Sequence, residues 1–267
     1  MKEMTKEETE NFLEVLRKKE ECAFKKRSFD ELRFVESIFP GCMALTFDTE
    51  KDWLEKRKEF LCASDTPCIL GVGFRSNVSI WEDKCDAESV RKRKPASEMV
   101  ERSMRLGKMS EPLVRSQIEV DHSLTVFDGT NILVVNTNIL DKNGNPFLAA
   151  TLDGVMIDES GNPIIVEIKR TESWTAFGAT PPIGYRAQVL KQMLVTGANE
   201  AILVARTVKF YANGIRQAKE DEYKFSTSEK QDKYDMECIR KVETMFWENY
   251  VLGKKKPDLQ IAEPEGK

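Results

Sequence analysis

The 267-residue sequence predicts an α/β fold in which a mixed central sheet is flanked by helices, with extra helices at the N- and C-terminal ends. Three observations lead to this fold class. Short apolar runs separated by turn residues fill residues 131–169, which is typical of neighbouring strands. Apolar residues recur with helical spacing before this segment, at 97–120, and after it, at 185–196. An apolar run at 200–207 then predicts a buried strand that returns to the sheet, so we expect one large domain with helical additions.

The segment before the sheet is predicted to be helical. Amphipathic spacing covers residues 6–20 and 29–38, and shorter helical patterns follow at 53–60 and 77–84. Ser64 has the residue type of an N-cap, which predicts a short helix directly after it.

A long helical pattern at 97–120 contains Gly107 and Pro112. Proline lacks the backbone N–H that an interior helical position needs, and its ring clashes with the preceding turn. We therefore expect this helix to kink there or to restart with Ser110 as a cap.

Turn signals divide the remaining chain. The predicted strands before the second long helix are residues 131–140, 147–152, 155–157 and 164–169. A strand-like stretch at 208–211 is expected to lead into a long helix at 228–252, whose apolar residues form one stripe. We predict three parts of the chain, namely an N-terminal helical extension (1–52), a main domain (53–252) and a tail (253–267).

Composition limits the function classes. The net charge of −4 argues against a passive polyanion binder, but local basic runs could still contact nucleic acid: Lys25–Arg27, Arg91–Lys94 and Lys254–Lys256. Solvated loops are the simpler interpretation of these runs. The six cysteines include no Cys-x-x-Cys pair, which predicts reduced structural thiols rather than a zinc site. With His122 as the only histidine, Ser/His and Cys/His nucleophilic schemes are disfavoured.

The sequence contains no run of roughly 20 apolar residues that could cross a membrane. Its start, Met1 to Lys6, is too polar for a signal peptide. We therefore expect a cytoplasmic protein with no membrane partner.

The turn at residues 158–162 predicts an antiparallel hairpin with a particular register. Asp153 lies as far before Ser160 as Glu167 lies after it, so a symmetric turn makes the two acids cross-strand partners with Cβ atoms roughly 5 Å apart. Lys169 lies two residues beyond Glu167 and projects from the same face of the strand. A divalent metal would reconcile two such carboxylates, and Mg²⁺ commonly uses one or two carboxylates plus substrate phosphate. The arrangement indicates phosphodiester hydrolysis, whereas a solvated surface hairpin is the alternative.

Four separated segments, in this order, make the chain similar to the phage lambda exonuclease or YqaJ-like recombinase family of PD-(D/E)xK nucleases. They are Trp53-Leu54-Glu55-Lys56-Arg57 with the residues that follow to Lys84, Gly107 to Pro112, Thr151-Leu152-Asp153-Gly154 with Val166-Glu167-Ile168-Lys169, and Tyr185-Arg186-Ala187-Gln188-Val189. The resemblance implies a restriction-endonuclease-like core. Leu152 departs from the proline that many members have before the catalytic aspartate, which leaves the ligand itself intact.

The resemblance also implies a metal site that uses Mg²⁺ or Mn²⁺, with two ions in the active site. Asp153 and Glu167 would be the metal-binding carboxylates, and the main-chain carbonyl of Ile168 would be a further ligand. Glu111 would serve the second metal; a helix-start acid favoured by the helix dipole is the alternative for this residue.

Further roles follow from the same resemblance. Lys169 would orient and help to deprotonate the attacking water, or stabilise the charge of the transition state, and Gln188 would hold the water or Lys169 in place. Arg57 and Ser64 match positions that bind a terminal 5′ phosphate, which suits the bidentate grip of a guanidinium. Cys62 replaces a hydroxyl residue common near that pocket, which weakens the 5′ assignment.

The function implied is an exonuclease that degrades linear double-stranded DNA from its ends, 5′ to 3′, in phage-type homologous recombination. A single-strand annealing protein would be the partner, and family analogy implies a homotrimer. Two rivals remain open: a structure-specific or restriction-like endonuclease on the same core, and a non-catalytic DNA-binding protein.

Overall fold

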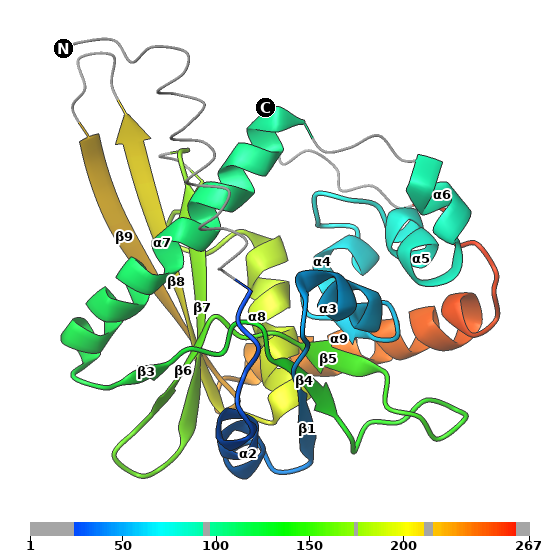
Figure 1. Cartoon of the computed structure of the whole chain (residues 1–267), viewed down its shortest axis with the longest axis horizontal. Coiled ribbons are helices and arrows are strands. Elements are labelled where there is room, and N and C mark those ends of the chain that lie inside the picture. The colour runs from blue at the N-terminus through cyan, green and yellow to red at the C-terminus, as the bar shows by residue number, and fades with distance from the viewer. Residues whose placement is uncertain (1–23, 93–96, 174–175, 211–215, 260–267) are drawn as a thin grey trace.

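The computed structural model describes residues 24–92, 97–173, 176–210 and 216–259, so the predicted helix at residues 6–20 lies outside the described part. These residues form two mixed sheets with helices around them (Figure 1). The predicted α/β class is therefore confirmed, with two sheets where the sequence led us to expect one.

The five-stranded sheet has the order β3-β6-β7-β8-β9. Its strands are β3 (Val126–Phe127), β6 (Gly154–Ile157), β7 (Pro163–Thr171), β8 (Glu200–Phe210) and β9 (Arg216–Ser226). β7 pairs antiparallel with β6 and parallel with β8, so it is a central strand. Central strands are buried on both faces, which explains the nearly continuous apolar run of β7.

The four-stranded sheet has the order β1-β4-β5-β2. Its strands are β1 (Cys42–Leu45), β4 (Leu133–Asn136), β5 (Leu148–Ala150) and β2 (Leu61–Cys62). β2 runs parallel to β5, and the other pairs are antiparallel. The sequence did not predict β1 and β2, because each is a short strand that its sheet partners complete.

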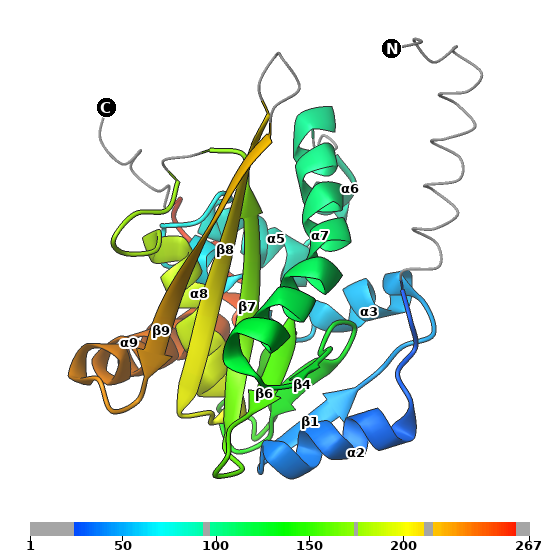
Figure 2. The ribbon, with the colours of Figure 1, turned by 90° about the vertical axis from the view of Figure 1, so that its left-hand side faces the viewer.

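Two helices cover opposite faces of the five-stranded sheet (Figure 2). α7 (Glu98–His122) packs Val114 and Ile118 against Val166 and Ile168 of β7. α8 (Ile183–Thr196) contacts the other face of β7 and β8 and also touches β4 and β5. α8 therefore lies between the two sheets and contributes to the main hydrophobic core.

α7 does not restart at Ser110, which was one of the two outcomes predicted for this segment, and the kink stays a prediction. It runs unbroken from Glu98 to His122 through Gly107 and Pro112, and Ser97 caps its N-terminus. Ser110 is an interior residue whose hydroxyl donates to the carbonyl of Gly107. Packing of α7 on β7 compensates for the hydrogen bond that proline cannot make, as tertiary contacts commonly do.

The remaining helices complete the described part of the fold. They are α2 (Phe29–Ile38), α3 (Glu50–Arg57), α4 (Thr66–Ile69), α5 (Asn77–Cys85), α6 (Ala87–Lys92) and α9 (Lys230–Phe246), which continues into a π-helical turn η1 (Trp247–Val251). The N-cap of α4 is Asp65, so the prediction that Ser64 caps this helix was wrong. None of the helices in the described ranges is long and apolar enough to cross a membrane.

β9 was missed altogether. The sequence predicted a strand-like stretch at residues 208–211 and then a helix at 228–252, with no strand between them, but β8 continues to Phe210 and β9 pairs with it along its whole length. β9 carries charged residues on both faces because it is an edge strand, and such charges discourage pairing with another chain. Apolar alternation, the usual signal of a strand, is weak there for that reason.

Candidate active site at the end of the hairpin

The β6–β7 hairpin has the predicted register. Gly154 pairs with Val166, which places Asp153 opposite Glu167, and Gly161 adopts a left-handed φ of 84° in the turn between them. The Asp153 carboxylate accepts a hydrogen bond of 2.8 Å from the backbone N–H of Ile168. The side chain of Ile168 lies on the other face of β7, in the apolar cluster against α7. The two acids are therefore held side by side where β6 begins, at the open end of the hairpin.

Glu167 is nearly inaccessible, with 1% of its surface exposed. Its Oε1 accepts hydrogen bonds from the Lys169 ammonium and from Gln188 at 2.6 Å, and its Oε2 accepts one from Gln192 at 2.6 Å. A buried carboxylate persists as an ion only when such donors replace water. Glu167 is thus fixed in one orientation by β7 and α8.

Gln192 was not predicted as part of the site. It lies on α8 four residues after Gln188, fully buried, and donates to the backbone carbonyl of Thr151 as well as to Glu167. Residues four apart share one helix face, so the Gln-x-x-x-Gln spacing of α8 was the signal that could have revealed it.

The electrostatics of the site are dominated by crowded negative charge. Burial and the charge of Glu167 raise the pKa of the Asp153 carboxyl well above its usual value. Burial, followed by Glu167, also raises the pKa of half-buried Glu111 on α7. Burial opposes the charged form of Lys169, but the negative charges of Glu167 and Asp153 stabilise the ammonium and raise its pKa above the usual value. Lys169 is therefore a cation at neutral pH, and three acids face it.

The donor set fits a hard divalent cation. Among the described residues, no group of three or more acidic, histidine or cysteine side chains has the arrangement of a preformed metal site. However, Asp153 Oδ1 has no hydrogen-bond donor in the described part of the protein, whereas Oδ2 is held by Ile168. Oxygen-only ligands and surplus negative charge are what Mg²⁺ and Mn²⁺ require. Asp153, Glu167 and Glu111 could hold such an ion.

One cavity of about 1250 Å³ joins this site to a distant part of the sequence. Lys169 and Gln188 line it, together with Arg57 at the end of α3 and Ser64 before α4. The cavity therefore brings together two of the residues predicted for catalysis and the two predicted for phosphate binding. The three acids are not part of its lining.

Arg57 and Ser64 form a small polar group on the cavity wall. An Arg57 Nη atom donates to the Ser64 hydroxyl at 2.7 Å, and the guanidinium stacks over the Trp53 ring at 4.4 Å. Two neighbouring cations are already paired, Lys84 with Asp65 at 2.9 Å and Arg75 with Asp83. Arg57 forms no ion pair with any described residue, so its charge is available to an anion.

Cys62 lies next to the Arg57 backbone and does not line the cavity. The side chain is buried, and its Sγ lies 3.7 Å from the backbone carbonyl of Arg57. A thiol in this place leaves the Arg57–Ser64 contact intact. His122 lies at the end of α7, where its ring contacts Glu222 of β9 at 2.8 Å.

The fold and site define an α/β protein with an Asp, Glu and Lys cluster at the end of a mixed sheet. Residues 52–199, more than half of the chain, match the YqaJ-like viral recombinase domain. The chain belongs to this family, which confirms the resemblance noted in the sequence.

Solved structures with a similar backbone include two of LHK-Exo. The alkaline exonuclease LHK-Exo from Laribacter hongkongensis is 16% identical, with 77% of this chain and 98% of that chain covered and a TM-score of 0.46. LHK-Exo in complex with dAMP is 16% identical, with coverages of 76% and 98% and a TM-score of 0.47. A phage-related exonuclease from Haemophilus somnus 129PT is 11% identical, with coverages of 73% and 96% and a TM-score of 0.46. No curated protein matches the sequence.

Proposed function

We propose that this protein is a metal-dependent exodeoxyribonuclease that degrades linear double-stranded DNA from its ends, 5′ to 3′. The observation that carries the proposal is the single cavity lined both by Lys169 and Gln188, beside Glu167, and by Arg57 and Ser64. A phosphate-sized anion at Arg57 and a scissile phosphodiester at Lys169 would occupy one continuous space. Membership of the YqaJ-like family supports the same reaction class.

Asp153, Glu167 and the main-chain carbonyl of Ile168 would hold one Mg²⁺ or Mn²⁺, and Glu111 would serve a second. Bound metal would supply Lewis-acid chemistry, lowering the pKa of an attacking water and stabilising the leaving oxygen. Lys169 would act as a cation that stabilises the charge developing on the phosphate, because its raised pKa keeps it protonated. Gln188 would keep Glu167 and the reacting water in place through its amide.

The 5′ polarity rests on Arg57 and Ser64. The guanidinium lies over the Trp53 ring and donates to Ser64, so two contacts position it before a ligand arrives. A planar guanidinium with free N–H groups suits a terminal phosphate, which accepts two parallel hydrogen bonds. Degradation would then proceed from the phosphorylated 5′ end.

The remaining parts of the proposal rest on family analogy. Residues 53–252 would form the nuclease domain, DNA ends would be the substrate, and a single-strand annealing protein would be the partner in phage-type recombination. A homotrimer that encloses DNA would support processive degradation.

The test uses the full-length protein with a linear duplex and with covalently closed circular DNA, each with and without Mg²⁺. We expect the linear duplex to be degraded only with the metal and the closed circle to remain intact. Cleavage of the closed circle would replace the proposal with an endonuclease. Binding of DNA without degradation under any metal would identify a non-catalytic DNA-binding protein.

A further inference from the structure

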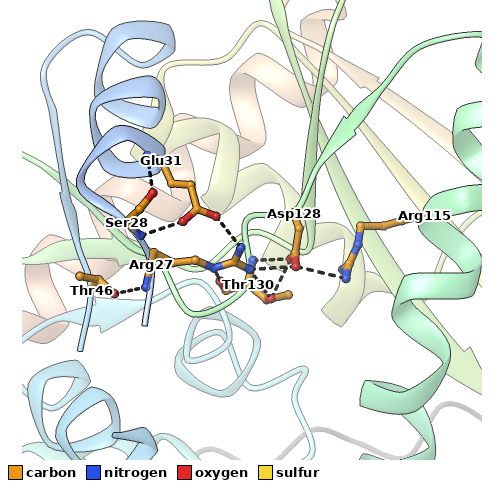
Figure 3. A network of polar contacts seen from close by, with 7 residues as sticks. All are labelled: Arg27, Ser28, Glu31, Thr46, Arg115, Asp128 and Thr130. Atoms are coloured by element: carbon orange, nitrogen blue, oxygen red, sulfur yellow. Dashed lines mark hydrogen bonds and ion pairs between the residues drawn. The ribbon is translucent and has the colours of Figure 1, made fainter. Parts of the chain in front are cut away.

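Arg115 is a half-buried arginine that the reaction scheme above leaves unused. It lies one helical turn after Glu111 on α7, with 12% of its side chain exposed. One Nη atom donates to the main-chain carbonyl of Asp153 at 3.0 Å. The other faces the carboxylate of Asp128 at 3.5 Å (Figure 3). Arg115 therefore connects the helix that carries one predicted metal ligand to the backbone of another.

The loop that contains Asp128 lies directly against the segment before Asp153. A side chain at Gly129 would come within 2.9 Å of the backbone carbonyl of Leu152, so the two stretches of backbone touch. Real Cβ atoms do not approach carbonyl oxygens so closely, and glycine alone permits this contact. A shift of the Asp128 loop would thus be transmitted to Asp153.

Asp128 is held from its other side by Arg27. The Arg27 guanidinium, 5% exposed, lies 2.9 Å from the Asp128 carboxylate and donates to the backbone carbonyl of Thr130 at 2.8 Å. Thr130 in turn donates its hydroxyl to Asp128 at 2.7 Å. A third contact of Arg27, 3.0 Å to Glu31, fixes it to α2 (Figure 3). The network accordingly runs from the segment before α2 to the main chain of Asp153.

This network fixes the backbone beside acids that repel one another. Asp153 and Glu111 both face the charge of Glu167, and without metal these acids repel one another. The Arg115 contact to the Asp153 carbonyl fixes the backbone while leaving the carboxylate free of that arginine. Partners that orient metal ligands in this indirect way commonly change metal affinity by roughly 10- to 100-fold.

We propose that Arg115 is a positioning residue for the metal-binding carboxylates of Asp153 and Glu111, and that Asp128 and Arg27 hold it in place. The inference rests on the proposed function, because it assigns those two acids to metal. It concerns how tightly metal binds and assigns Arg115 no contact with DNA.

The experiment measures Mn²⁺ binding to the full-length protein by calorimetry without DNA, and the Mg²⁺ dependence of linear-duplex degradation. Arg115→Met should raise the Mn²⁺ dissociation constant about 10- to 100-fold. It should also raise the Mg²⁺ concentration for half-maximal rate, while the rate at saturating metal largely recovers. Arg115→Lys, which can keep only one of the two contacts, and Asp128→Asn should give smaller shifts in the same direction. Arg240→Met removes a helix arginine that is exposed and paired with Glu237, and should change neither measurement.

A purely structural arginine would behave differently. It would lower the unfolding midpoint and the rate at all metal concentrations, without moving the dissociation constant of the folded protein. That result, or unchanged Mn²⁺ affinity in Arg115→Met, would overturn the inference. If Arg115→Met does not fold, unchanged Mn²⁺ affinity in Arg115→Lys and Asp128→Asn together would overturn it equally. Absence of DNA degradation by the unmodified protein would overturn the proposed function instead, since Mn²⁺ binding is measured separately.

Discussion

Two buried ionic clusters contact the same helix, α8, and they differ in access to solvent. In the first, Glu167 meets Lys169, whose side chain is 22% exposed and lines the cavity. In the second, Lys191 of α8 meets Glu243 of α9, and both side chains are completely buried. We call Lys191 and Glu243 the sealed pair, and Glu167 with Lys169 the open cluster. Glu243 also accepts a hydrogen bond from Thr66 of α4, so the sealed pair joins three helices.

The net pKa shifts of the two lysines have opposite directions, although burial alone lowers the pKa of both. In the sealed pair, burial lowers the pKa of Lys191 and raises the pKa of Glu243, so each group is pushed toward its neutral form. In the open cluster, burial is outweighed and the pKa of Lys169 is raised by two carboxylates. The sealed pair balances one charge against one, whereas the open cluster has surplus negative charge. That surplus, next to a cavity, is what distinguishes a candidate metal site from a structural ion pair.

The largest expected effect is the loss of hydrolysis in Asp153→Ala. Removing this ligand should slow degradation of a linear duplex by at least about 100-fold, the scale of losing one preorganised electrostatic group. DNA binding should persist because it draws on phosphate contacts spread over the surface. Degradation and gel-shift assays on the same preparation check both parts. Appreciable residual cleavage would contradict the metal assignment.

The sealed pair should matter for stability. Glu243→Gln leaves Lys191 as a buried charge without a counter-ion, which should cost about 3–5 kcal/mol in the free energy of unfolding. The double variant Lys191→Met with Glu243→Leu removes both charges and should cost much less. Urea unfolding measures the difference. A double variant as unstable as the single one would show that packing, and not the unpaired charge, sets the cost.

The open site was predictable from sequence to the extent that it is local. A turn centred on Ser160 fixes the register of the hairpin, so the pairing of Asp153 with Glu167 follows from counting residues. That Lys169 and Arg57 line one cavity is a product of tertiary packing, and only the family resemblance pointed to it. Gln192 and Arg115 were missed because each acts through a partner on another element.

In the fold, too, features set by local sequence were predicted, and features set by their surroundings were missed. Strands with apolar alternation were predicted, but β9 was missed because an edge strand can be charged on both faces. Ser64 was assigned as an N-cap by residue type alone. The short helix begins at Thr66 with Pro67 in its first turn, Asp65 takes the cap position, and the Asp65 carboxylate bonds to Lys84 and the Cys62 amide.

Arg57 tests a cavity charge that forms no salt bridge with a residue in the described ranges. Arg57→Ala should remove a preference for 5′-phosphorylated over 5′-hydroxyl ends, because it removes a charge-assisted contact of about 1.5–3 kcal/mol, roughly 10- to 100-fold in rate. Initial rates on end-labelled duplexes measure it. Equal rates on both ends by the unmodified protein would refute the 5′ pocket and leave the nuclease assignment standing.

The smallest expected effect is a pH dependence of stability without metal. The pKa of Asp153 is raised in the folded protein, so the folded state binds this proton more tightly than the unfolded chain does. Its stabilising contribution is present below the ordinary aspartate pKa and is lost as pH rises through the folded pKa. Unfolding free energy without metal should therefore decline over that window, and Asp153→Asn should flatten the decline. An equal decline in Asp153→Asn would assign the pH dependence to other groups.

The most direct test compares Glu167→Gln with Glu243→Gln, measuring the degradation rate of a linear duplex with Mg²⁺ and the free energy of unfolding on the same preparations. Glu167→Gln should abolish degradation and retain most of the stability. Lys169 would still have Asp153 nearby as a counter-charge and would still be partly exposed to water. Glu243→Gln should lose stability and, under conditions where it is folded, degrade DNA at nearly the unmodified rate. Sustained degradation by Glu167→Gln, or loss of catalysis in folded Glu243→Gln, would contradict the division between an open catalytic cluster and a sealed structural pair.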